Sequence, residues 1–278
     1  MSVRASSGAE RSPGLLAYAL AYLAFLYAPV ALLPLFSFND SLFIAFPLSG
    51  FTARWYAEMA ADEAMHRALL NTLKVGVVAS LFSTIAGLLA AKALTHGPLP
   101  GRSALLGFTS LPLFIPEIVL GIALLMLMAA LNIPLSLISV VVGHVLICLP
   151  FAIAVLMARF EGFDMNLEEA SRDLGEDGWM TFWRVTFPLV LPGIVASLLL
   201  TFIVSFDEFM IAFFLCGTDT TLPVYIFGEL RFPYKLPSVL ALGSTILIVS
   251  AALVFLAEWI RGIGTGAKPA AGVGGLAT

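Results

Sequence analysis

The chain has 278 residues, of which 60% are hydrophobic and 12% are charged, and its formal net charge is −4. A soluble domain is typically about a quarter charged, so this apolar surplus exceeds what one soluble core can bury and indicates a bilayer environment. The acidic balance argues against a nucleic-acid partner. Cys148 and Cys216 lack the spacing of a metal site, and Cys148 lies inside an apolar run, which argues against a structural disulfide.

Six apolar stretches are long enough to cross a hydrocarbon core of about 30 Å. The first follows Arg4 and Arg11; it is too long for a signal peptide and has no small-residue cleavage site, so we expect it to stay as an anchor. The expected spans are about 14–38, 69–94, 104–131, 136–158, 188–215 and 238–260. The sequence therefore predicts an all-α polytopic membrane protein over 14–261. An N-terminal tail, 1–13, precedes it, and a Gly- and Ala-rich tail expected to be disordered, 262–278, follows it.

The distribution of Lys and Arg orients these spans. With the N-terminus inside, the inner segments carry nine basic residues: Arg4, Arg11, Lys92, Arg102, Arg159, Arg172, Arg184, Arg261 and Lys268. The outer segments then carry five: Arg54, Arg67, Lys74, Arg231 and Lys235. The inner excess predicts that both termini and the loop 159–187 are cytoplasmic.

The first outer loop, 39–68, has apolar residues loosely at helical spacing among charged ones. They are Phe51, Trp55, Tyr56, Met59 and Met65. This pattern predicts a short amphipathic helix at the membrane surface, acting as an interfacial connector.

The loop 159–187 is a polar island between two apolar runs. Its pattern predicts two short helices broken near Gly175 or Gly178, with Asp164 or Asn166 capping the first. Glu168 and Glu169 lie in its opening turn, where carboxylates interact favourably with the helix dipole. Leu167, Ala170 and Leu174 recur at i, i+3 and i+7 as a narrow apolar face, and Trp179, Phe182, Trp183 and Phe187 form an aromatic stripe. Periodicity alone is equally typical of a solvated loop with interfacial aromatics.

The spacing of this loop resembles the EAA loop of ATP-binding-cassette importer permeases. The matching positions are Glu169, Ala170, Ser171, Gly175, Val185, Phe187 and Pro188, with Ser171, Val185 and Phe187 as conservative departures from the family pattern. The resemblance implies a coupling helix that inserts into a groove on a cytoplasmic ATPase subunit. We expect Gly175 to permit a sharp turn, because a side chain there would clash or resist a positive φ.

Asn71-Thr72-Leu73, at the start of the second span, resembles the start of that family's membrane core. Three further segments resemble the spermidine/putrescine branch of the family, in its second permease component. They are Ser205-Phe206-Asp207-Glu208-Phe209, Thr221-Leu222-Pro223-Val224 and Val239-Leu240-Ala241-Leu242-Gly243. The resemblance implies the type I importer permease fold in a bacterial inner membrane and a small cationic solute such as a polyamine. The implied partners are an ATPase subunit, a second permease subunit and a periplasmic or lipid-anchored solute-binding protein.

Three carboxylates lie within apolar spans. Asp207 and Glu208 are in the fifth span, and Glu117 follows Pro116 in the third. A charge at mid-membrane costs about 2.5–3.5 kcal/mol on insertion scales, and such groups usually face a bundle interior or a water-filled path. They indicate a route for a cation. They could equally cap broken helices, pair with a partner subunit or lie near the outer interface. We expect His144 to be a hydrogen-bonded packing residue.

The chain has no P-loop, no Gly-x-Ser-x-Gly elbow and no His-Glu-x-x-His pattern, so we predict no enzyme activity and no cofactor, with ATP hydrolysis on a partner. One alternative is a secondary transporter, which would need an internal repeat. Another is a membrane enzyme or scaffold, which would need a catalytic constellation. A permease for a solute other than a polyamine also remains open.

Overall fold

The computed structural model describes residues 13–96 and 100–264, so the expected tails lie outside the described residues apart from Pro13 and 262–264. Within that range the chain is mainly helical and forms no β-sheet. Five of the described helices are long and apolar enough to cross a membrane, and a bent pair of helices would supply a sixth crossing. The all-α architecture expected from the sequence is confirmed. The chain divides into two compact units, one of which is Glu63–Gly228 and the other the residues on either side of it.

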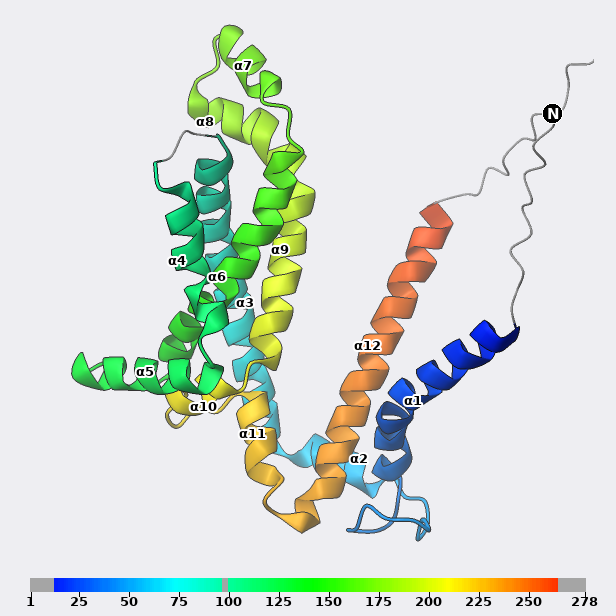
Figure 1. Cartoon of the computed structure of the whole chain (residues 1–278). Helices are drawn as coiled ribbons and strands as arrows, with labels where there is room; N and C mark the ends of the chain where they lie inside the picture. The colour runs from blue at the N-terminus through cyan, green and yellow to red at the C-terminus, as the bar shows by residue number, and fades with distance from the viewer. Residues whose placement is uncertain (1–12, 97–99, 265–278) are drawn as a thin grey trace, which may run out of the picture. The chain divides into compact units, whose positions relative to one another are not determined.

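Three long helices form the centre of the unit Glu63–Gly228. They are α3 (Glu63–His96), α6 (Leu137–Glu161) and α9 (Phe187–Asp207), and they pack against one another (Figure 1). Small and hydroxylated side chains allow this close approach. A Cβ built on Gly87 would lie 2.7 Å from the Cβ of Ala152, and Thr84 Oγ1 lies 3.0 Å from Ser197 Oγ.

The expected third span is broken. It consists of α4 (Arg102–Phe114) and α5 (Glu117–Ala130), whose axes differ by 101°. Pro116 has no N–H to donate and disfavours helical geometry at the residue before it. Ile115 accordingly takes the extended ψ of 131°. The break falls at Pro116, one of the two prolines of this span, and the pair of helices covers the expected range 104–131.

The expected fifth span is also interrupted. α9 ends at Asp207, and the short helix α10 (Met210–Leu215) follows after two non-helical residues. α10 packs against α5 and α6, where buried side chains of α3, α5, α6 and α10 form one apolar cluster. A second cluster joins α3, α6 and α9 through Ala91, Leu156, Phe160, Val190 and Ile194.

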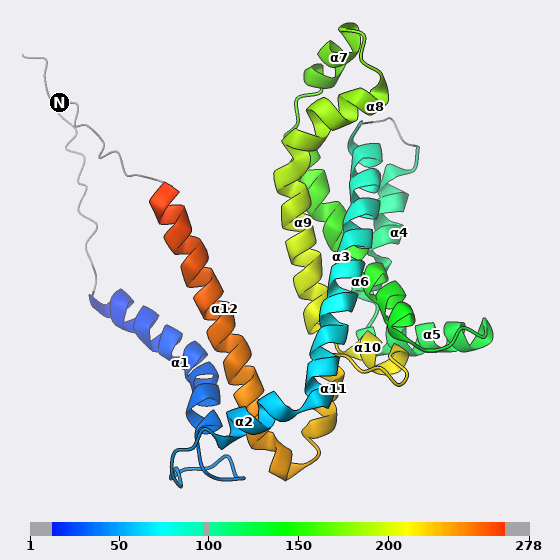
Figure 2. The same ribbon diagram turned by 180° about the vertical axis from the view of Figure 1, so that it is seen from behind.

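The loop between α6 and α9 contains α7 (Asn166–Asp173), α8 (Gly178–Thr181) and the π-helical turn η1 (Phe182–Thr186). Figures 1 and 2 show α7 and α8 at one end of the α3–α6–α9 bundle, and α5 and α10 at the opposite end. The short helix α11 (Leu222–Glu229) follows α10 and reaches the end of this unit.

The other unit contains α1 (Pro13–Ser37), α2 (Arg54–Ala61), the 3₁₀ turn η2 (Pro233–Lys235) and α12 (Leu236–Gly264). α2 is the helix expected in the first outer loop. Its Trp55 is buried and donates from Nε1 to the carbonyl of Asn39 at 2.8 Å. The Tyr56 hydroxyl lies 2.7 Å from Ser37 Oγ and 3.2 Å from Ser244 Oγ. Tyr56 of α2 thus contacts both α1 and α12.

Candidate functional site

The loop 159–187 is an ordered pair of short helices, as the sequence predicts. Asp164 lies one residue before the N-cap Met165 of the first, and its Oδ1 accepts from the backbone N–H of Asn166 at 3.0 Å. The Asp177 carboxylate caps the second by accepting from Met180 N–H at 2.7 Å. Local hydrogen bonds therefore fix the start of each helix.

The turn between the two helices is a Schellman motif that ends α7. Gly175 N–H donates to the carbonyl of Arg172 at 2.9 Å, and Glu176 N–H donates to that of Ser171 at 3.2 Å. Gly175 has φ +95°, which confirms the expected left-handed conformation. A Cβ placed there would have no atom within 4 Å, so the expected clash is absent. The requirement for glycine is conformational.

The inner face of α7 is polar and buried. Glu168 is 3% exposed; it lies 3.1 Å from Lys92 Nζ of α3 and accepts a hydrogen bond from Thr186 Oγ1 of η1. Ser171 Oγ lies 3.2 Å from Thr181 Oγ1. Ser171 therefore packs inside the loop. The sequence placed Glu168 in the first turn but did not identify its partners. The only sequence signal was a lysine at the inner end of the second span.

The outer face of the same helix carries exposed side chains. Glu169 and Ala170 are exposed, and Leu174 is 87% exposed. The aromatic stripe continues this face: Trp179 is 66% exposed and lies 5.7 Å from the ring of Trp183. Of the remaining matched positions, Val185 and Phe187 are half-buried and Pro188 is exposed. The loop thus separates a buried polar inner face from an outer one on which exposed apolar side chains lie among charged ones.

Glu208 takes the capping role that the sequence left open. Its carboxylate is buried and accepts from the N–H groups of Ile211 at 2.9 Å and Ala212 at 3.0 Å. His144 Nε2 lies 3.1 Å from the same carboxylate, and His144 Nδ1 lies 2.7 Å from Ser205 Oγ. His144 is the hydrogen-bonded packing residue that we expected. Together these contacts stabilise the break between α9 and α10.

The other two acids have different surroundings. Asp207 is the last residue of α9 and is exposed. Glu117 is the first residue of α5 and is also exposed, in the turn where a carboxylate favours the helix dipole. The structure therefore separates the buried Glu208 from two acids that are open to a ligand or a partner.

Two of the segments that carry the sequence resemblance touch each other. Asn71 Nδ2 donates to the carbonyl of Thr220 at 3.1 Å, and Leu222 N–H donates to Thr72 Oγ1 at 2.6 Å. The start of the second span thereby holds the segment that leads into α11.

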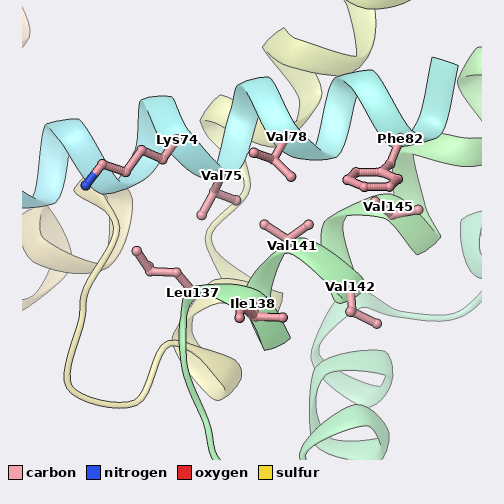
Figure 3. Close-up of a pocket in the computed structure, with 9 residues that line it drawn as sticks. All are labelled: Lys74, Val75, Val78, Phe82, Leu137, Ile138, Val141, Val142 and Val145. Carbon is pink, nitrogen blue, oxygen red and sulfur yellow. The ribbon is translucent and has the colours of Figure 1, made fainter. Parts of the chain in front are cut away.

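A cavity of about 550 Å³ lies between α3 and α6. Figure 3 shows Lys74 and Phe82 toward opposite ends of its lining, with valines of both helices between them. Lys74 is the charged residue of this lining, and the others are apolar. A lining of this kind does not suit a cationic solute.

Comparison with known proteins gives one family match. Residues 83–262 match the model of the binding-protein-dependent transport system inner membrane component. This range contains the whole loop 159–187 and the three acids.

Two curated relatives are similar over most of the chain. One is the spermidine/putrescine transport system permease protein PotC of Escherichia coli (strain K12), 31% identical over 238 residues, or 85% of this chain and 89% of the relative. The other is the putrescine transport system permease protein PotI of the same strain, 31% identical over 258 residues, or 90% and 91% of the two chains. Among solved structures, a chain of a bacterial alginate ABC transporter in complex with an alginate pentasaccharide-bound periplasmic protein has a TM-score of 0.67 at 19% identity. That match covers 91% of this chain and 93% of that one.

Proposed function

Because the chain belongs to the family of inner membrane components of binding-protein-dependent transport systems, we propose that the loop 159–187 is its docking site for an ATPase subunit. The chain is a multi-pass permease subunit of an importer, and the family is one of transport components rather than catalysts. It forms part of a translocation pathway. A separate polypeptide hydrolyses ATP, and a second permease subunit completes the pathway.

The observation that carries this proposal is the exposed apolar outer face of the loop. Leu174 is 87% exposed beside the turn at Gly175, and Trp179 is 66% exposed beyond it. Contiguous exposed apolar side chains with a polar border mark an interaction site. Glu169 is part of the polar border. Ala170 has a small side chain, which suits insertion of α7 into a groove. Ser171, Val185, Phe187 and Pro188 support this face from within the loop and from the start of α9.

The proposed substrate is a polyamine such as spermidine or putrescine. The printed names of the two curated relatives support it, and so do the exposed acids Glu117 and Asp207, since carboxylates attract a cationic solute. Glu208 serves this route by fixing the break after Asp207 rather than by contacting the solute. A solute-binding protein delivers the substrate at the end of the permease that carries these acids.

The proposed orientation places both termini and the loop 159–187 in the cytoplasm. The excess of Lys and Arg in the inner segments supports it. Docking of an ATPase subunit also requires the loop to be on the cytoplasmic side, where ATP is available.

Co-purification of the ATPase subunit with the tagged permease tests the docking proposal. Leu174→Asp should abolish recovery, because it places a charge in the centre of the outer face. Phe43→Asp is the matched control: it changes a side chain that is 73% exposed in the loop before α2 and should leave recovery unchanged. Equal recovery from both variants would overturn the proposal.

A further inference from the structure

One buried carboxylate joins the loop to a helix that is distant in sequence. Glu168 of α7 contacts Lys92 Nζ of α3 at 3.1 Å and accepts a hydrogen bond from Thr186 of η1. The ammonium of Lys92 also lies 5.1 Å from the ring centroid of Phe182, the first residue of η1. These four residues, Glu168, Lys92, Thr186 and Phe182, are named the Glu168 clasp.

The loop is covalently continuous with α6 and α9 but not with α3. α7 continues from α6 and leads through α8 and η1 into α9, so the chain itself can pull on those two helices. α3 has no such connection to the loop, since it ends at His96. Within the described residues, Lys92 of the clasp therefore links the third long helix of the bundle to α7.

Of the ion pairs that the described residues of the loop make, the Glu168–Lys92 pair of the clasp is the least exposed to water. The side chain of Glu168 is 4% exposed and that of Lys92 is 29% exposed. Loss of Lys92 would leave this buried carboxylate with Thr186 and with Arg172, whose Nη2 lies 3.7 Å away and whose side chain is 58% exposed. The pair between Arg184 and Glu176 has 63% and 28% exposed side chains and is screened by water. The Glu168 clasp resists opening, whereas the Arg184–Glu176 pair can exchange with solvent.

The π-helical turn completes the geometry. Phe187 N–H donates to the carbonyl of Phe182, which widens the turn before α9. This turn contains both Phe182, next to Lys92, and Thr186, which donates to Glu168. Such turns frequently occur at functional sites.

We infer that the Glu168 clasp transmits the motion of α7 to α3, so that α3, α6 and α9 move as one body when the ATPase subunit closes. The inference rests on the proposed function, since it assumes docking on the outer face. Glu168 and Lys92 are then positioning residues that lie behind the docking surface. Their loss should leave docking intact and uncouple ATP hydrolysis from transport.

The test uses the full complex of permeases, ATPase subunit and binding protein in proteoliposomes, with putrescine as the probe. Lys92→Met and Glu168→Gln should each lower putrescine uptake per ATP hydrolysed by about tenfold, given how strongly a buried pair resists loss of one partner. Lys92→Arg keeps the cation and should restore coupling. The double variant should be no worse than either single one, because both remove the same contact. Arg102→Met, which removes an exposed cation from the first turn of α4, is the control and should behave as the parent does.

A distance measurement separates transmission from general instability. Spin labels on Asp173→Cys in α7 and Ala93→Cys in α3, both exposed positions, should give a narrow distance distribution in the parent. Lys92→Met should broaden it, and Lys92→Arg should narrow it again. Normal uptake per ATP in Lys92→Met and Glu168→Gln, or an unchanged distribution, would overturn the inference. Loss of the ATPase subunit from these variants would also contradict it. A parent complex that never retains the ATPase subunit would instead overturn the proposed function.

Discussion

At the scale of single residues, two adjacent acids have opposite roles. Glu208 holds a helix break through two backbone N–H groups and His144, whereas Asp207 is exposed at the end of α9. A buried acceptor is costly to remove because its donors lose their partner. An exposed carboxylate can be neutralised at little structural cost.

We therefore predict that Asp207→Asn lowers uptake of a cationic solute while the complex still assembles. Glu208→Ala should instead lower the stability of the permease by about 2–4 kcal/mol, as expected when buried donors and a buried histidine lose their acceptor. Uptake of labelled putrescine and thermal stability of the purified protein measure the two effects. If Asp207→Asn lowered the thermal stability and Glu208→Ala left it unchanged, these assignments would be contradicted.

Glycines in the loop allow a matched pair of substitutions. Gly175 has φ +95°, Gly178 does not share that conformation, and a Cβ at either position meets no atom within 4 Å. Gly175→Ala should weaken docking by about 1–2 kcal/mol, the usual cost of a left-handed non-glycine residue. Gly178→Ala should leave affinity for the ATPase subunit unchanged. Titration of the ATPase subunit onto both variants measures the difference, and equal affinities would rule out a conformational role for Gly175.

At the scale of elements, the sequence predicts long helices well and their interruptions poorly. Apolar length identifies α3 and α6, because a membrane helix needs only enough apolar residues. The 101° bend before α5 depends on the backbone conformation of Ile115 and Pro116 and on the side chains against which α5 packs. Proline marks the position of a break but not its direction.

At the candidate site, too, the sequence predicts local features but not tertiary contacts. The match at Glu169 and Gly175 identified the loop, and the positive φ of Gly175 followed from turn chemistry. The partners of Glu168 could not be predicted, because Lys92 is 76 residues away and which of two adjacent acids faces the bundle depends on the packing of the loop. Contacts of this kind belong to tertiary structure rather than to local pattern.

The packing of α10 provides a prediction at this scale. A Cβ on Gly143 of α6 would lie 2.4 Å from Ile211 and 2.9 Å from Leu215, whereas a Cβ on Gly107 of α4 meets no atom within 4 Å. Gly143→Val should therefore displace α10 and destabilise the protein by about 1–3 kcal/mol, the usual cost of overpacking. Gly107→Val should be tolerated. Thermal unfolding in detergent distinguishes them, and similar midpoints would contradict the packing.

At the scale of the whole molecule, orientation decides which surfaces meet which partners. The count of Lys and Arg predicts that the loop 159–187 lies inside and the loop 39–68 outside. A membrane-impermeant maleimide should therefore label Phe43→Cys in intact cells and spare Asp173→Cys. The two positions should label alike after permeabilisation. Strong labelling of Asp173→Cys before permeabilisation would reverse the topology.

The outer face of α7 is the proposed route by which closure of the ATPase subunit moves the permease. The most direct test reconstitutes the complex and measures ATPase activity stimulated by the binding protein, together with transport and retention of the ATPase subunit. Glu169→Lys reverses a charge on the exposed border, and Gly175→Asp puts a side chain at φ +95°. Both should insert into the membrane normally and lose stimulation and transport, through lost docking or through uncoupling. Normal docking, stimulation and transport in both variants would show that the loop is only a connector.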